Sequence, residues 1–138
     1  MPERDLARLP DWLVIGQEDW DQVERRNQLL VRALAERHPN SRFLFTELPL
    51  RPRAVRRWRP PRPQQVAPNI WRMRPIRPLP AAGALERLGD RIESAQIRRV
   101  LRTLGMQRPA LWTQDPRVET LVDLLPVGAP GGSTALGR

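Results

Sequence analysis

The chain has 138 residues, of which 40% are hydrophobic, and this suits one domain with a modest core. It contains no cysteine and one histidine, so disulfides, thiolate metal sites and histidine-rich metal sites are excluded. The net charge is +9, every basic residue is an arginine, and no apolar run is long enough to cross a membrane. We therefore expect a cytoplasmic protein without a bound metal, able to lie peripherally at the inner face of the membrane.

The stretch from Asp11 to Ala35 predicts a buried strand, a polar loop and an amphipathic helix. Trp12–Ile15 is continuously apolar, as in an interior parallel strand that is covered on both faces. Asn27 lies in the middle of the predicted buried face of the helix, and Arg26 lies at its edge. Either Asn27 bonds the main chain of a neighbouring loop, or Arg26, Asn27 and Gln28 point into a cleft. The predicted buried face consists of Trp20, Val23, Leu30, Val31 and Leu34.

A second strand is predicted from Arg42 to Leu48. Because it follows its helix closely, we expect a right-handed strand–helix–strand unit with parallel strands. Glu47 falls at the carboxyl end of this strand, at the same edge as the loop after Ile15, where open α/β sheets bind ligands. Glu47 either accepts a hydrogen bond from a ligand hydroxyl or forms an ion pair with a nearby arginine.

The segment from Pro49 to Pro80 holds nine of the sixteen prolines. Proline fixes φ and removes a backbone donor, so we expect no long helix or central strand here. Residues 67–74 are compatible with a short strand, and the remainder is predicted to be an extended, positively charged loop. From Leu48 to Leu85 there are nine arginines and no acid, whereas the other fifteen arginines are balanced by fifteen acids.

This basic segment allows three interpretations. The first is a solvated insertion loop. The second is contact with an anionic membrane surface or a phosphate-bearing acceptor through Arg51–Arg77. The third is nucleic-acid binding, with Trp58 and Trp71 stacking on bases, and the lack of a recognised nucleic-acid module argues against it.

The rest of the chain predicts a helix, a strand and a second, shorter helix. The first helix spans Leu85–Leu104 and ends at Gly105, which suits a left-handed C-terminal residue. Pro109–Thr113 is the strand, and Asp115 begins the shorter helix. Residues 127–138 are predicted to be a disordered tail. The expected buried residues of the long helix are Leu85, Leu88 and Ile92 in its first half and Ile97, Val100, Leu101 and Leu104 in its second.

The order of elements indicates an α/β fold, a partial Rossmann-like parallel sheet with flanking helices and a proline- and arginine-rich insertion. The strands are few for a complete sheet, so either one more lies in the proline-rich segment or the chain stops early. Neither a phosphate-binding loop motif nor a nucleophile-elbow motif is present in the sequence. The residues alone therefore predict a ligand-binding edge of the sheet, but they indicate no type of reaction.

The sequence also resembles a known family. Trp12–Gly16, the pair Trp20-Asp21 and the motif Arg26-x-Gln28 resemble the amino-terminal domain of bacterial two-domain, GT-B-type glycosyltransferases. Phe43–Pro49 and Pro109–Pro116 are similar to later strands of that domain. These enzymes are retaining and use a nucleotide diphosphate sugar as donor, with no resident cofactor implied. The resemblance implies that residues 1–126 are an incomplete amino-terminal domain of such an enzyme.

By the resemblance, the intact enzyme moves a hexosyl unit to a cell-envelope or polysaccharide acceptor. The amino-terminal domain of the family usually contacts the acceptor, and the second domain makes most contacts with the donor. We therefore expect this chain alone to be inactive, and we assign no catalytic residue. The alternative is a non-enzymatic Rossmann-like module whose arginine-rich arm binds membrane or protein partners. The resemblance places Trp20, Arg26, Gln28 and Asp115 by the cleft, and the position of the residues adds Asn27 and Glu47 as substrate-binding candidates.

Overall fold

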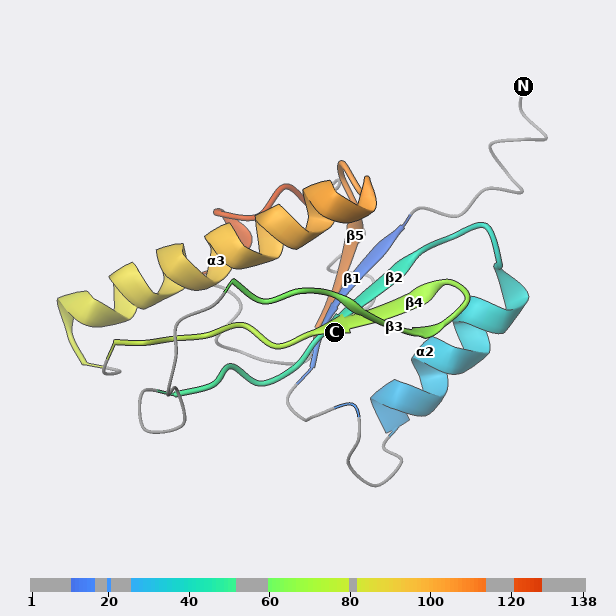
Figure 1. Ribbon diagram of the computed structural model, residues 1–138, viewed down its shortest axis with the longest axis horizontal. Helices are drawn as coiled ribbons and strands as arrows, with labels where there is room; N and C mark the ends of the chain where they lie inside the picture. Colours follow the sequence, from blue (N-terminus) through green and yellow to red (C-terminus); the bar gives the residue numbers. More distant parts are fainter. Residues whose placement is uncertain are drawn as a thin grey trace.

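The computed structural model describes residues 11–16, 20, 26–51, 60–79, 82–113 and 121–127, with the main chain alone at residues 26 and 27. Within these residues, five strands form one sheet in the order β3-β4-β2-β1-β5. The helices α2 (Arg26–Arg37) and α3 (Ala84–Leu104) cover its two faces (Figure 1). The strands are β1 (Trp12–Ile15), β2 (Phe43–Thr46), β3 (Gln64–Ala67), β4 (Ile70–Met73) and β5 (Ala110–Thr113).

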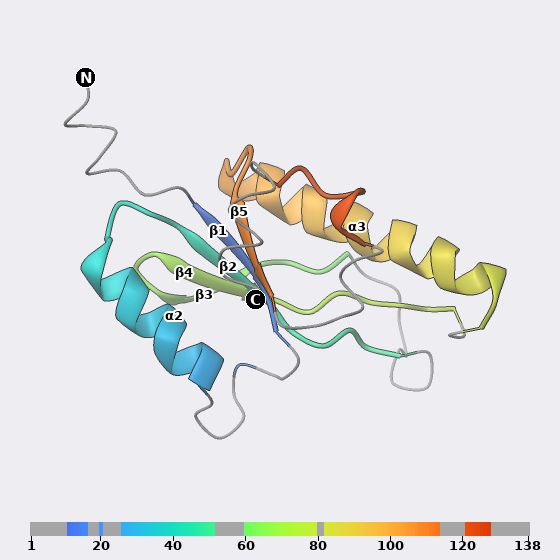
Figure 2. The ribbon, with the colours of Figure 1, turned by 180° about the vertical axis from the view of Figure 1, so that it is seen from behind.

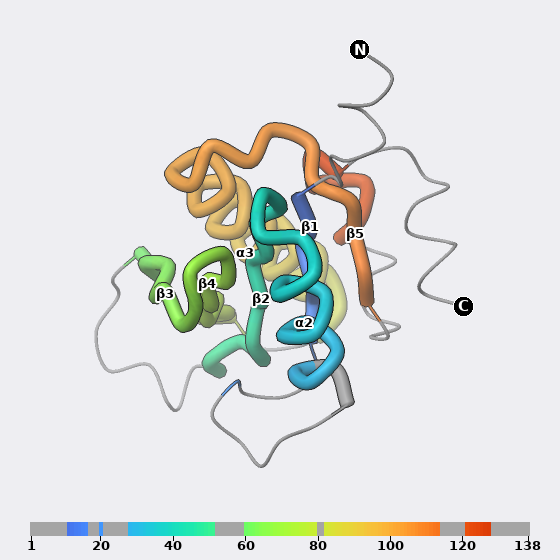
Figure 3. The backbone as a smooth tube through the Cα atoms, turned by 90° about the vertical axis from the view of Figure 1, so that its right-hand side faces the viewer, coloured from blue at the N-terminus to red at the C-terminus, as the bar shows by residue number. Residues whose placement is uncertain are grey.

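Four of the five strands run in the same direction. β1 pairs in parallel with β2 on one side and with β5 on the other. The register sets Trp12 beside Phe43 and Ile15 beside Thr46. The expected parallel pairing of the first two strands around an intervening helix is therefore confirmed. β3 and β5 are the two edge strands of the sheet, on opposite sides of it (Figure 3).

The expectation that the proline-rich segment contains no central strand was wrong. β4 lies between β3 and β2, antiparallel to the first and parallel to the second. The prolines flank these strands instead of interrupting them: Pro63 precedes β3, Pro68 lies in the turn before β4, and Pro75 follows β4. Proline at such positions removes no hydrogen bond from the central ladder. The extra strand that the sequence left open therefore lies here, as part of a hairpin.

The β2–β4 pairing continues beyond the regular strands. The N–H of Leu50 donates to the carbonyl of Pro75 at 2.9 Å, and the N–H of Arg77 donates to the carbonyl of Leu50 at 2.9 Å. At the other end of the hairpin, Asn69 Nδ2 lies within 3.1 Å of the carbonyls of Ala35, His38 and Ser41. These carbonyls lie at and beyond the end of α2, where a helix leaves acceptors unsatisfied. Half of the basic segment is therefore integral to the fold.

Alternate side chains of β1 enter two separate cores, one on each face of the sheet. Leu13 and Ile15 pack with Ile97 and Leu101 of α3. Val14 packs in the other core, under α2. Figure 2, seen from behind, shows the sheet between the two helices, one on each face. The continuous apolar run of β1 was therefore interpreted correctly as a strand covered on both sides.

The predicted buried face of α2 is confirmed except at Leu30. Trp20 and Val31 are buried and Leu34 packs against the same core, whereas Leu30 is 42% exposed, and Val23 lies outside the described residues. The buried side chains are Gln28, Val31 and Ala35, which recur at helical spacing on a face turned away from Leu30. Gln28 Nε2 donates to the main-chain carbonyl of Trp20 at 2.6 Å, and Ala35 packs in the core under the helix.

α3 begins one residue before the predicted start and ends at Leu104 as predicted, but the first half of its predicted buried face is wrong. Ile97, Val100 and Leu101 are buried, and Gly105 adopts the left-handed φ of 74° expected after the helix. Leu85 and Leu88 are exposed, and the first half buries Asp90 and Glu93 instead. The reason is that this half runs beside the segment after β4, which presents Arg77 to it (Figure 1).

Several predictions concern residues outside the described ranges. These are the helix start near Asp115 and most of the tail, residues 128–138; the described residues 121 and 122 are helical. Among the described residues, no helix is long and apolar enough to span a membrane.

Candidate functional site

The candidate site lies where β1, β2 and β4 end. Parallel strands bring their carboxyl ends to one edge, and the following loops carry the groups available to a ligand. Here that edge holds Gly16 after β1, Glu47 after β2 and Arg74 after β4. We call these three residues, together with Trp20 and Gln28 of the connection from β1 to α2, the carboxyl rim.

Glu47 is the central acid of the carboxyl rim. Its Oε2 accepts the N–H of Trp20 at 2.8 Å, and Arg74 Nη2 lies 3.4 Å from the same oxygen. Glu47 is only 7% exposed. Of the two roles open to it from the sequence, the ion pair with an arginine is the one that the structure contains. Its carboxylate also holds the main chain of Trp20 at the sheet edge.

Trp20 is anchored at both its main-chain groups and its indole ring. While Glu47 accepts its N–H, Gln28 Nε2 donates to its carbonyl at 2.6 Å. The indole packs edge-on against Phe45 with centroids 5.1 Å apart, and the guanidinium of Arg32 lies 5.1 Å from the ring centroid. The ring is 3% exposed, so Trp20 shapes the rim from below and offers little surface to a ligand.

The floor of the rim is closely packed. A Cβ added at Gly16 would lie 2.5 Å from Cζ of Phe45, so only glycine fits without movement of the ring. Thr46 Oγ1 donates to the carbonyl of Val14 at 3.2 Å, and Thr113 Oγ1 donates to the carbonyl of Ile15 at 3.1 Å. Both hydroxyls are therefore occupied by main-chain carbonyls of β1.

The structure thus brings together three of the six predicted site residues: Trp20, Gln28 and Glu47. The side chains of Arg26 and Asn27, and the whole of Asp115, lie outside the described residues. The main chain of Arg26 begins α2, at the same edge. In the described ranges, no group of three or more acids or histidines is arranged to hold a metal ion.

The large apolar side chains that are exposed among the described residues occupy two places. Leu29 and Leu30 lie in the first turn of α2 and Leu48 follows β2, near the carboxyl ends of the parallel strands. Leu85 and Leu88 lie in the first turns of α3, which begins on the other face of the sheet and far from the start of α2 (Figures 1 and 2). Exposed apolar groups can mark a surface that contacts another molecule or domain.

Sequence reasoning missed a buried charge cluster on Arg77. Its Nη1 lies 2.9 Å from Asp90 Oδ1 and 2.8 Å from Glu93 Oε1, and its Nη2 donates to the carbonyl of Glu86. Burial acts to lower the pKa of Arg77, but the hydrogen bonds and charges of Glu93 and Asp90 outweigh it and raise that pKa. Arg77 therefore stays charged, and a substitution at Gly89 would meet its guanidinium at 2.5 Å. The spacing of Asp90 and Glu93 on one helix face was the available signal.

The chain matches no protein-family model, no curated protein and no solved structure. No family is identified by these comparisons, and the fold class rests on the mostly parallel sheet itself.

Proposed function

We propose that this chain is the acceptor-side, amino-terminal part of a two-domain glycosyltransferase. The intact enzyme would transfer a hexosyl unit from a nucleotide diphosphate sugar to a cell-envelope or polysaccharide acceptor. The observation that carries the proposal is the interlocking of Glu47, Trp20 and Gln28 at the ends of parallel strands. These residues come from separate parts of the resemblance, and they define one edge of the sheet.

Two further features support this function. Leu29 and Leu30 in the first turn of α2 and Leu48 after β2 are exposed apolar side chains near this edge, of the kind that a second domain would cover. Arg26 begins α2, where the helix dipole and a guanidinium both favour an anion. In the closed enzyme we assign Arg26 to stabilise the leaving diphosphate, which develops negative charge during transfer.

The first experiment locates saccharide binding on the chain. Amide signals of the ¹⁵N-labelled protein are followed while maltotriose and other oligosaccharides are added, and separately a nucleotide diphosphate hexose. We expect an oligosaccharide to shift the amides of Gly16, Trp20 and Glu47, because they border the rim. If no saccharide of the panel moves these signals at millimolar concentration, or the shifts fall elsewhere, the acceptor-side assignment is wrong.

The second experiment addresses Arg26 in a two-domain enzyme that contains this chain. Arg26→Ala is expected to lower kcat by about 100-fold, the scale of losing one group that stabilises transition-state charge. Arg37→Ala is the matched control, because Arg37 is exposed at the other end of the same helix. Unchanged turnover in Arg26→Ala would remove this role from Arg26.

The second candidate function is that of a non-enzymatic module that binds membrane or protein partners through Arg51–Arg77. The observation that favours it is the location of the whole charge surplus in residues 48–85. Arg51 and Arg62 are exposed, whereas Arg74 and Arg77 are engaged by acids of the fold. Sedimentation with anionic vesicles at low and high salt tests this function, since binding by exposed charges weakens with salt. An absence of binding at low salt would exclude membrane contact.

A further inference from the structure

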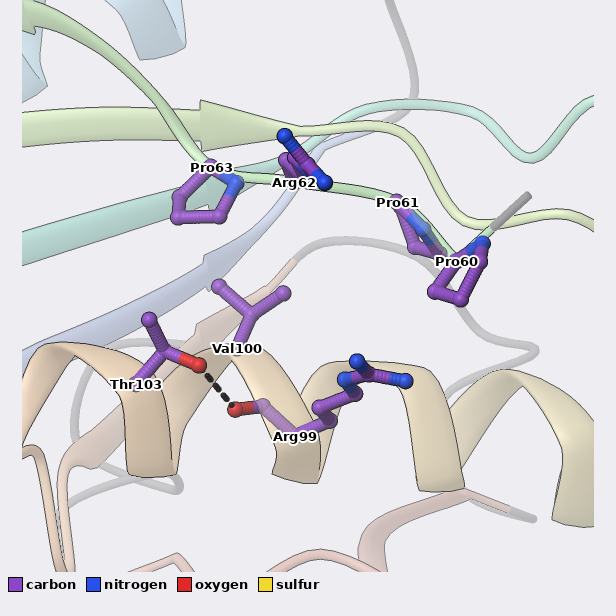
Figure 4. Close-up of a pocket in the computed structure, with 7 residues that line it drawn as sticks. All are labelled: Pro60, Pro61, Arg62, Pro63, Arg99, Val100 and Thr103. Atoms are coloured by element: carbon purple, nitrogen blue, oxygen red, sulfur yellow. Dashed lines mark hydrogen bonds between the residues drawn. The ribbon is translucent and has the colours of Figure 1, made fainter.

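A groove of about 710 Å³ lies between the segment before β3 and the second half of α3 (Figure 4). Its volume falls in the range of small-molecule sites, roughly 300–1,000 Å³. It shares no residue with the carboxyl rim. The residues that line it are Pro60, Pro61, Arg62, Pro63, Arg99, Val100 and Thr103.

The lining combines an apolar floor with two cationic side chains. Val100 is 1% exposed and points from α3 toward the ring of Pro63, while Arg99 extends toward Pro60 and Pro61 on the opposite wall (Figure 4). Thr103 is tied to its own helix, since its hydroxyl donates to the carbonyl of Arg99 at 3.0 Å. The proline rings offer rigid apolar surface with a fixed backbone, so little conformational freedom is lost on binding.

The two arginines of the groove have no acid beside them in the sequence. Residues 60–79, which include Arg62, contain no aspartate or glutamate, and neither do residues 94–109, which include Arg99. Among the described residues, neither guanidinium forms an ion pair, and both residues are exposed. Glu93, the acid that precedes the second stretch, is already bonded to Arg77. Both walls therefore contribute positive charge that the described part of the fold leaves uncompensated.

We propose that this groove binds the phosphate group of an organic phosphate, with Arg62 and Arg99 as the cationic contacts. Arginine suits phosphate because its planar fork of donors matches the geometry of the oxygens. The prolines and Val100 would receive the apolar part of the same molecule. A free phosphate ester and the headgroup of an acidic lipid present this chemistry alike, and the site is independent of sugar transfer at the carboxyl rim.

The probes separate the two sources of phosphate. Phenyl phosphate and inorganic phosphate are titrated by calorimetry, and binding to phosphatidylcholine vesicles is measured with and without phosphatidic acid. We expect phenyl phosphate to bind more tightly than inorganic phosphate, because its ring buries apolar surface. If only the vesicles with phosphatidic acid bind, the phosphate belongs to a lipid headgroup. If neither phenyl phosphate nor those vesicles bind, the proposal is overturned.

Substitutions then tie binding to the groove. Arg62→Gln and Arg99→Gln are each expected to weaken binding about tenfold, the scale of a lost charged hydrogen bond, and the double variant to abolish it. Arg91→Gln is the matched control, because Arg91 is exposed on the same helix, outside the groove lining. An equal loss in Arg91→Gln would show diffuse attraction by net charge and overturn the site. Thermal melts of all variants should coincide, since none of these side chains is buried.

Discussion

Arg77 and Glu93 form an ion pair in which Nη1 and Oε1 lie 2.8 Å apart, with each side chain 3% exposed. The pair joins the extension of β4 to the first half of α3, and Asp90 contributes a second carboxylate. Charges buried this deeply stabilise a fold only while they remain paired, because each would otherwise have lost its water without compensation.

Arg77→Met should therefore lower the free energy of unfolding by about 3–5 kcal/mol, because two carboxylates are left buried without their cation. Urea denaturation followed by far-UV circular dichroism measures the loss. The companion variant combines Arg77→Met with Asp90→Asn and Glu93→Gln, and it should recover much of that loss, since no buried charge is then unpaired. A single variant within about 1 kcal/mol of the parent, the scale of a surface ion pair, would show that the cluster is solvated.

Glu47→Ala should destabilise the protein by roughly 1–3 kcal/mol, because the buried N–H of Trp20 loses its acceptor. Glu47→Gln retains an oxygen for that N–H and loses only the charged contact with Arg74, so its cost should be smaller. Hydrogen exchange of the Trp20 amide gives a local readout. It should accelerate in Glu47→Ala far more than in Glu47→Gln, and equal exchange in both would mean that Glu47 does not hold the Trp20 amide.

The sequence was sufficient for features that depend on neighbours along the chain. The apolar run of β1, the glycine after α3 and the parallel pairing of β1 with β2 all follow from local pattern and connection length. Arg77 and its acids are far apart in the sequence, so composition showed a basic segment but not its partners. For the same reason the arginines of β4 and its extension seemed available to a membrane, although they are used within the fold.

Two errors had different causes. On α3, the helical wheel treated polar residues as solvent-facing and placed Leu85 and Leu88 in the core, because the partner Arg77 that buries the carboxylates there is distant in sequence. In the proline-rich segment, the number of prolines argued against a central strand, although the prolines flank β4 and do not interrupt it. At the candidate site, sequence order predicted which edge Glu47 would occupy, and the hydrogen bond to Trp20 appeared only in three dimensions.

Substitutions of apolar residues on the two halves of α3 should differ strongly in their cost to stability. Leu88→Ser removes a side chain that is 44% exposed, so its effect on the free energy of unfolding should stay within about 0.5 kcal/mol. Ile97→Ala empties a fully buried position and should cost about 2–5 kcal/mol. Chemical denaturation of both variants under one condition compares them. A large loss in Leu88→Ser would mean that the first half of the helix is covered by apolar groups in solution.

Gly16 and Phe45 should be energetically coupled, because a methyl group at Gly16 would meet the ring at 2.5 Å. Gly16→Ala is expected to cost about 1–3 kcal/mol through the overpacking of this contact. Phe45→Leu removes the ring tip and has its own cost, since Phe45 is fully buried and supports Trp20 edge-on. In the double variant the methyl group fits. The loss of unfolding free energy in the double variant should therefore be smaller than the sum of the two single losses by about 0.5 kcal/mol or more, the size of coupling seen between residues in contact. Denaturation of the parent, the two single variants and the double variant completes the double-mutant cycle. Strict additivity of the losses would show that a methyl group at Gly16 does not press on the ring of Phe45.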